Sequence, residues 1–298
     1  MRSRNAGRIC DGLWYFGREE SGVYLIEGEE ASLIVSGGMS YLAPVVVGQF
    51  KAFGVDERKI TKLLILHAHF DHVGLVPFFR RRYPRLDIFA SARGCEVLRT
   101  SRAIETINAF SRLVAERMGF LGCLSGSDLE WRNDIVALTV SEGESIDLGG
   151  FTVKIFETPG HSSCSISAYV PELRVLFPSD GGGIPYGETI LPAGNSNFSM
   201  YQKSLQKLQL LDVDFLCADH YGYVTGDEAK TYINCSIDAA KEMRALIEIV
   251  LKRTGSIEET VRELVGDIFD RHPGYFLSPE IYAGVYRQTV RHIAGTMG

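Results

Sequence analysis

One short stretch of the sequence holds three histidines and an aspartate within six positions. The stretch is LLILHAHFDHVG, residues 63–74, and its polar residues directly follow an apolar run. Imidazole and carboxylate groups are costly to bury without partners, but they are good ligands for metal ions. Past the end of a strand the chain can turn, so side chains two positions apart can converge while their neighbours face another point. The pattern His67-x-His69-x-Asp71-His72 therefore predicts a loop that supplies ligands to two adjacent ions.

Three further segments place a candidate ligand just after the pattern of an apolar strand. His161 lies in ETPGHSS, Asp180 in VLFPSDGGG and His220 in LCADHYG. Ligands carried at strand ends are held more rigidly than ligands on long loops. Five of the seven histidines fall in these positions. The other two, His272 and His292, lie near the C-terminus, where we expect surface or packing roles.

In their order and spacing, these seven residues resemble the metallo-β-lactamase superfamily, and the match covers roughly residues 10–225. The resemblance implies an αββα sandwich with the site at one edge of the two sheets. It implies that one metal ion is bound by His67, His69 and His161. The second ion would be bound by Asp71, His72 and His220, with Asp180 bridging the two ions.

Three positions depart from the usual pattern of this family without removing a ligand. Ser179 stands where a glycine usually precedes the bridging aspartate. Ala218 and Asp219 stand where Pro-Gly usually precedes the last histidine. The early strand reads LIVSGG, where an aspartate often precedes the Thr/Ser-Gly pair.

The residue types also define the expected chemistry. Two cations joined by a carboxylate can hold a bridging water and lower its pKa to near neutrality. The resulting hydroxide, oriented by Asp71, would attack a carbonyl or phosphoryl group, and the metals would stabilise the oxyanion. We expect two divalent ions, zinc first for this N/O ligand set, with iron or manganese as alternatives. Tyr221 and Tyr223 flank Gly222 just after a ligand, and they are candidates for polarising a carbonyl oxygen, with simple packing as the alternative.

Strands and helices alternate along the chain up to about residue 222 and must position these ligands. Strand patterns cover 13–17, 22–28, 31–38, 62–66, 86–90, 134–140, 151–158, 165–170, 174–180 and 214–220, with a turn at 144–150. Helical patterns cover 40–53, 74–82, 92–119 and 199–211. Because the strands come in groups and not in strict βαβ alternation, we predict an α+β fold, an αββα sandwich over residues 1–224.

A helical appendage over residues 225–298 follows the predicted sandwich. Its three helices are predicted over 226–253, 257–270 and 279–294, opened by Thr225-x-x-Glu228, Ser256-x-x-Glu259 and Ser278-Pro279. The first helix carries an apolar stripe that must bury against the sandwich or a second subunit, so a homodimer stays open. The stripe consists of Tyr232, Ile233, Ile237, Ala240, Ile247 and Val250.

The layout of this appendage, with PGYFLSPEIY at residues 273–282, resembles more loosely the PqsE-type thioesterases. That resemblance implies a helical cap over the metal cleft and a thioester or ester substrate. Tyr275, Phe276 and Tyr282 would line the acyl pocket, or would only dock the helices onto the sandwich.

The predicted function is a binuclear metal-dependent hydrolase that uses a bridging hydroxide on a thioester or ester. The alternatives are a lactonase or phosphodiesterase of the same superfamily, a single-iron persulfide dioxygenase, and a non-catalytic metal-binding signalling protein.

Composition limits the partners and the compartment. The 298 residues carry a net charge of −6, which argues against nucleic acid or an anionic membrane as a partner and leaves a small-molecule substrate. No apolar run approaches the roughly 20 residues that a membrane helix needs, and no apolar segment follows the basic N-terminal residues. The six cysteines are scattered without a C-x-x-C pair, so we expect reduced thiols in a cytoplasmic protein.

Overall fold

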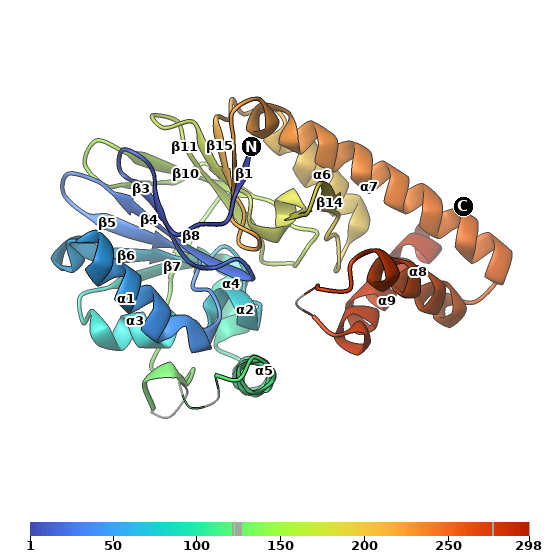
Figure 1. Cartoon of the computed structure of the whole chain (residues 1–298), viewed down its shortest axis with the longest axis horizontal. Helices are drawn as coiled ribbons and strands as arrows, with labels where there is room; N and C mark the ends of the chain where they lie inside the picture. The colour runs from blue at the N-terminus through green and yellow to red at the C-terminus, as the bar shows by residue number, and fades with distance from the viewer. Residues whose placement is uncertain (121, 123–126, 276, 298) are drawn as a thin grey trace.

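Two seven-stranded sheets face each other, and helices cover their outer faces (Figure 1). The computed structural model describes every residue except 121, 123–126, 276 and 298. The predicted αββα sandwich of the α+β class, with helices at its C-terminal end, is confirmed. None of the helices in the described part of the chain is long and apolar enough to cross a membrane.

The first sheet combines an antiparallel half with a parallel half. In spatial order its strands are β2 (Gly7–Cys10), β3 (Leu13–Arg18), β4 (Ser21–Glu27), β5 (Ser32–Val35), β6 (Ile60–Leu64), β7 (Asp87–Ser91) and β8 (Leu138–Val140). Strands β2 to β5 pair antiparallel, and β5 to β8 pair parallel. The parallel connections carry the helices of this layer, namely α1 (Ala43–Phe53), α2 (Phe70–Val73), α3 (Val76–Arg82), α4 (Ala92–Leu98) and α5 (Ser101–Arg117).

The second sheet is antiparallel except at one pair. Its order is β1 (Arg2–Ser3), β16 (Tyr223–Thr225), β15 (Phe215–Cys217), β12 (Val175–Phe177), β11 (Ile166–Val170), β10 (Thr152–Glu157) and β9 (Ser145–Asp147). Strands β12 and β15 pair parallel, and α6 (Phe198–Leu208) lies between them in sequence. A separate hairpin joins β13 (Ile184–Tyr186) to β14 (Thr189–Leu191).

Three apolar layers hold the sandwich together. The middle layer, between the sheets, buries Tyr24 and Leu64 from the first sheet against Phe177 from the second. One outer layer packs Phe50 and Phe79 under the helices of the first sheet. Burying an aliphatic or aromatic side chain of this size contributes about 1.5–3 kcal/mol, so these layers fix the sheets on which the ligands lie.

The other outer layer joins the second sheet to α6 and to the C-terminal helices. These helices are α7 (Asp227–Thr254), α8 (Ile257–Arg271) and α9 (Pro279–Thr296). The predicted stripe of α7 faces this layer within the chain, where five of its six residues are buried and Ile237 is partly buried. The stripe therefore needs no second subunit, and a homodimer would have to use another surface. The division of the chain near residue 225 stays a prediction, since one apolar layer runs across it.

Several local expectations differ from the structure. The strand predicted over 134–140 is shortened to β8, and the turn predicted over 144–150 contains β9. Thr225 ends β16 and does not cap α7, because the N-cap is Gly226 with a φ of 66°. The other two predicted caps are confirmed, since Ser256 accepts from the Glu259 amide and Ser278 from the Ile281 amide.

Candidate metal centre

The histidine-rich loop leaves the first sheet at the carboxyl end of β6. The backbone of His69 is extended, and α2 begins at the next residue, so Asp71 and His72 lie in the first turn of a short helix. The backbone amide of Gly37 donates to the His72 carbonyl at 2.7 Å. Gly74 is required where α2 ends, because a Cβ there would lie 2.4 Å from the Ser40 nitrogen. Close backbone packing therefore fixes the direction of this loop.

Three imidazole nitrogens converge in one group, which we call the first ligand group (His67, His69 and His161). His69 Nδ1 lies 3.1 Å from His67 Nε2 and 2.9 Å from His161 Nε2. His161 Nδ1 donates to the Ala193 carbonyl at 2.8 Å, which leaves the lone pair of its Nε2 directed at the group. Three such nitrogens around one point are the donor set of a divalent metal site.

A second ligand group consists of Asp71, His72 and His220. The Nε2 atoms of His72 and His220 each lie 3.6 Å from Asp71 Oδ2. His220 Nδ1 donates to the Glu20 carbonyl at 2.7 Å, which directs its Nε2 at the carboxylate. His72 Nε2 is buried and has no hydrogen-bond partner among the residues that the structure describes. A cation between these three side chains would satisfy this nitrogen.

Asp180 lies between the two ligand groups, in the turn that follows β12. Its Oδ2 is 3.5 Å from His161 Nε2 of the first group and 3.4 Å from His72 Nε2 of the second. Its Oδ1 is 3.7 Å from His220 Nε2. One carboxylate thus faces both groups, which is the arrangement that a bridging ligand requires.

The two ligand groups differ in how the protein shifts their pKa values. Burial, followed by the imidazole of His72, lowers the pKa of His67 well below its usual value. Desolvation by the surrounding protein and then His161 lower the pKa of His69 to about 4, although His69 is exposed, unlike the other two histidines of its group. Burial also lowers the pKa of His72, but the charges of Asp180 and Asp71 outweigh it and raise the pKa.

The two carboxyl groups of the site stay ionised, because the neighbouring imidazoles lower their pKa values. Burial raises the pKa of Asp71, but His72 and His220 outweigh it and lower the pKa to about 2. The same imidazoles hold the pKa of Asp180 well below its usual range despite its burial. Five imidazoles and two ionised carboxylates are therefore available, and they suit two divalent ions such as zinc, iron or manganese.

A cavity of about 530 Å³ opens onto both ligand groups. His69, Asp71, His161 and Asp180 lie in its wall. The rest of the wall is mainly apolar and comes from α2, α4, α5, the β13–β14 hairpin and α9. Its apolar side chains include Val97, Ile107, Phe110, Leu191, Ile281 and Val285. Helices α5 and α9 both contribute to this wall. In Figure 1, α5 lies below the first sheet and α9 lies among the C-terminal helices.

The predicted pocket residues are placed as follows. Tyr275 and Tyr282 both line the cavity, are largely buried, and pack against each other with ring centroids 5.4 Å apart. Phe276 lies outside the described residues. The C-terminal segment therefore contributes to the wall of the cavity.

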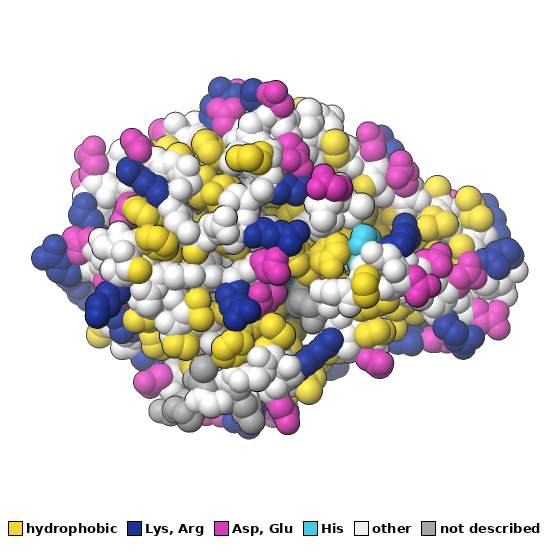
Figure 2. All heavy atoms as spheres, in the orientation of Figure 1, with side chains coloured by type: hydrophobic (Ala, Val, Ile, Leu, Met, Phe, Trp, Pro, Cys, Tyr) yellow, Lys and Arg dark blue, Asp and Glu magenta, His cyan; other side chains and the backbone are white. Residues whose placement is uncertain are grey.

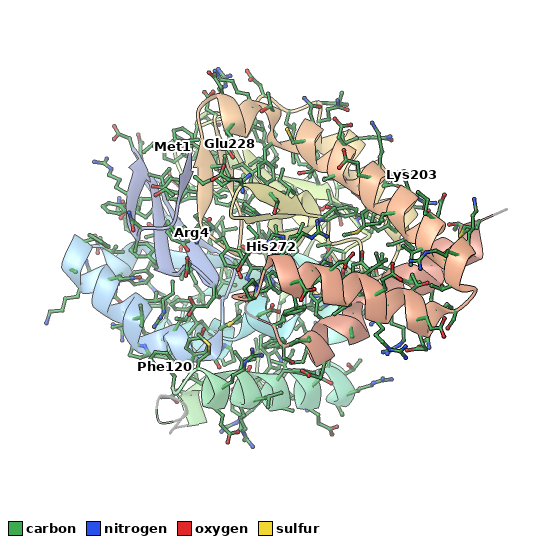
Figure 3. The ribbon with its side chains drawn as sticks, turned by 45° about the vertical axis from the view of Figure 1, so that its right-hand side comes forward. Met1, Arg4, Phe120, Lys203, Glu228 and His272 are labelled. Atoms are coloured by element: carbon green, nitrogen blue, oxygen red, sulfur yellow. The ribbon has the colours of Figure 1, made fainter. Side chains whose placement is uncertain are left out.

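The two tyrosines predicted to polarise a carbonyl lie elsewhere. Tyr221 is buried in an aromatic group with Tyr186, at 4.8 Å, and Tyr275, at 6.3 Å. Arg4 lies over the Tyr221 ring, and His272 packs against Tyr186. Figure 3 labels Arg4 and His272. Tyr223 packs its ring against Tyr15 at 5.8 Å, on the side of the core between the sheets. Neither tyrosine is among the described residues of the cavity wall. The position of Tyr223 between the sheets favours its packing role, whereas the role of Tyr221 stays a prediction.

Comparisons with known proteins agree with this geometry. The family model of the metallo-beta-lactamase superfamily matches residues 17–220. The chain belongs to this superfamily. A metallo-beta-lactamase fold-containing protein of Sulfurisphaera tokodaii is 23% identical over 187 residues, which cover 62% of this chain and 66% of that protein. A hydroxyacylglutathione hydrolase of Rhodopseudomonas palustris is 23% identical over 265 residues, which cover 87% of this chain and 83% of that protein.

Solved structures show the same fold. A metallo-beta-lactamase family protein from Thermus thermophilus superposes with a TM-score of 0.66 at 17% identity, covering 98% of this chain and 96% of that chain. The prediction of a metal-dependent hydrolase is confirmed at the level of the superfamily, and the His/Asp cluster is suited to divalent metal.

Sequence reasoning named the seven candidate ligands of this superfamily member but missed the groups that orient them. The carbonyls of Glu20 and Ala193 hold two of the histidines, and any residue type can supply a carbonyl, so no local signal marks them. Asp219 and Ser179 were visible in the sequence as departures from the family pattern. Both residues form hydrogen bonds with ligand histidines, Ser179 with His67 and Asp219 with His72.

Proposed function

We propose that the chain is a binuclear metal-dependent hydrolase that cleaves a thioester or ester with an apolar acyl group. The position of Asp180, which faces both ligand groups within 3.4–3.7 Å, supports the binuclear arrangement most directly. The first ligand group would hold one ion, and the second would hold the other. Zinc is the first expectation for both sites.

Two divalent ions in these positions supply Lewis-acid chemistry, which lowers the pKa of a water toward neutrality and polarises a carbonyl group. The chain's own residues do the rest. Asp71 lies in the cavity wall with an ionised carboxylate, so it can accept a hydrogen bond from a water and orient it toward a carbonyl carbon. An acyl chain bound against the apolar walls would displace water from the same space, which would strengthen the electrostatic interactions inside it.

The cavity wall favours an acyl substrate. Apart from the ligands, its polar side chains are few: Thr100, Arg102, Thr106, Asn195, Gln288 and the tyrosine hydroxyls. Arg102 is the single Lys or Arg among the described lining residues. An apolar acyl chain matches the rest of the wall, which offers a phosphodiester little beyond the two ions themselves.

The face of the molecule drawn in Figure 2 gives no sign of a nucleic-acid substrate. Figure 2 shows basic and acidic side chains interspersed over this face, with apolar side chains at the junction of the sandwich and the C-terminal helices. Counterion release on nucleic acid needs clustered Lys and Arg. A small-molecule ester or thioester therefore stays the favoured substrate, and the hydroxyacylglutathione hydrolases among the relatives support an acylated substrate by their name.

Metal analysis and a substrate panel test this proposal. Protein purified without chelators should contain two divalent ions per chain and should hydrolyse apolar acyl thioesters or esters faster than lactones and phosphodiesters. Asp180→Asn should lose metal and activity, and Asp212→Asn, at an exposed carboxylate bonded to Arg174, is the matched control. A single iron would favour the persulfide dioxygenase, and phosphodiester turnover above ester turnover would favour the phosphodiesterase. Two bound ions without turnover of any panel member would favour the signalling role.

A further inference from the structure

Behind the two ligand groups, four buried side chains form one chain of hydrogen bonds. His67 Nδ1 lies 3.0 Å from Ser179 Oγ, and Ser179 Oγ donates to Asp219 Oδ2. His72 Nδ1 lies 2.9 Å from the same Asp219 oxygen. Each of the four residues is at most 3% exposed. One carboxylate is thus connected to a histidine of each ligand group.

The donors in this chain can be assigned by counting protons. A carboxylate only accepts, so the hydroxyl proton of Ser179 goes to Asp219, and His72 donates its Nδ1 proton there as well. Ser179 then has no proton left for His67, so His67 must donate to Ser179 Oγ. Both histidines therefore carry their proton on Nδ1, and both present the lone pair of Nε2 to an ion.

The backbone around these residues supports the same arrangement. Ser179 adopts a φ of 49°, a conformation that costs free energy for a residue with a side chain and is kept where surrounding contacts enforce it. The Asp219 carbonyl accepts from the Gly22 amide at 2.7 Å, and the Ala218 carbonyl accepts from the Tyr24 hydroxyl at 2.6 Å. Asp219 is therefore held to the first sheet although it follows β15 of the second.

His67, His72 and Asp219 also lie close enough together to resemble a third metal site. Their facing atoms, however, are the two Nδ1 atoms and the carboxylate, and these already bond to one another or through the Ser179 hydroxyl. The group is therefore a hydrogen-bonded support for the two ligand groups, since its facing atoms already have partners and an ion would have to break those bonds.

We propose that Asp219 and Ser179 are positioning residues that set the tautomer and orientation of His67 and His72, and so couple the two metal positions through one carboxylate. The inference rests on the proposed binuclear function. It predicts that Asp219→Asn weakens the binding of both ions, because the neutral amide oxygen is a weaker acceptor than a carboxylate for the protons of His72 and Ser179. Loss of such outer partners typically lowers metal affinity ten- to hundred-fold.

Zinc titration of the metal-free full-length chain against a chromophoric chelator, together with the visible spectrum of the cobalt-loaded chain, tests the inference. Asp219→Asn should lower both affinities and shift the cobalt bands. Ser179→Gly, which removes the hydroxyl but suits a positive φ, should weaken mainly the ion bound by the first ligand group. Asp214→Asn, at a carboxylate whose partner is Arg174 at 3.2 Å, is the matched control and should change neither.

The outcomes separate the two proposals. If the unmodified chain binds two ions, and Asp219→Asn and Ser179→Gly bind them with unchanged affinity and spectrum, the positioning role is refuted while the proposed function stands. If the unmodified chain binds one ion or none, the binuclear function fails and the inference fails with it. Thermal unfolding of each variant with chelator present identifies any variant that is merely misfolded. If Asp219→Asn is misfolded, the result for Ser179→Gly decides whether the positioning role stands.

Discussion

The apolar cavity leads to a quantitative prediction about acyl chain length. Each methylene that moves from water into such a wall gains about 0.8 kcal/mol. A gain of about 1.36 kcal/mol corresponds to a factor of ten, so kcat/KM should rise about fourfold for each methylene added to the acyl chain. The rise should continue until the cavity of about 530 Å³ is filled and should then stop.

Narrowing the cavity should shift this series toward shorter chains. Ala103 lies on α5 in the cavity wall, so Ala103→Phe would place a ring in the space that the end of a long acyl chain occupies. Overpacking of this kind costs about 1–3 kcal/mol, which lowers kcat/KM for octanoyl esters about 5-fold to about 160-fold. Acetyl and propanoyl esters, which do not reach the ring, should be hydrolysed as before.

A series of p-nitrophenyl esters from acetate to octanoate measures both effects with one chromophore. Ala109→Phe is the matched control, since Ala109 lies on the exposed side of the same helix and is not among the lining residues. A flat or falling series in the unmodified enzyme would refute the assignment of the cavity to the acyl group. An equal loss of octanoate turnover in both variants would refute the placement of Ala103 beside the end of the acyl chain.

Three further predictions concern the metal positions. Asp71→Asn should remove most hydrolytic activity without unfolding the chain, because an amide orients a water poorly, and near-normal kcat with both ions bound would contradict that role. Calorimetry in buffers of different ionisation enthalpy at pH 7 measures the protons released as each ion binds. Binding to the first ligand group should release few, because the pKa values of His67 and His69 are lowered. Binding to the second should release more, because the pKa values of His72 and His220 are raised. As pH falls, the metal affinity of the second ligand group should therefore weaken first, whereas that of the first ligand group should persist until the pH nears the His69 value of about 4. Equal pH dependence of the two affinities would contradict the assignment. Chelation should lower Tm, because an ion at a thousand times its Kd stabilises the folded chain by about 4.1 kcal/mol, and an unchanged Tm would argue against resident metal.

Much of the fold follows from local sequence patterns, because the strands and helices near the site are strongly apolar or strongly amphipathic. The continuous apolar run before His67 predicts a strand covered on both faces, and β6 is such a strand. Residues 184–191 were missed because IPYGETIL includes a proline and is too short to show alternation, although its hairpin ends at the cavity wall. Strand β1 was missed because its two residues pair with β16, more than 200 residues away.

The candidate ligands could be predicted from the sequence, whereas the groups that form hydrogen bonds to them could not, for a physical reason. A ligand must be histidine or aspartate, so its type and its place at a strand end are visible in one sequence. Tyr223 shows the limit of this reasoning, because it begins β16 directly after Gly222, and the alternation of that strand turns its side chain toward Tyr15. Which face a side chain takes depends on the register between β15 and β16, and that register becomes known only from the folded chain.

The two ligand groups draw on both sheets, and this has a consequence for the lifetime of the folded chain. His67, His69 and His72 leave the first sheet, whereas His161, Asp180 and His220 leave the second. Ions bound between them would act as reversible cross-links across the sandwich, in a protein whose described cysteines are all free thiols. A covalent link closing a loop of about 100 residues stabilises a chain by about 4.7 kcal/mol in the chain-entropy model, and a metal link of similar span resembles it. The supply of metal would then set how slowly the sheets come apart, so that starvation for the ion shortens the half-life of the protein as well as silencing it.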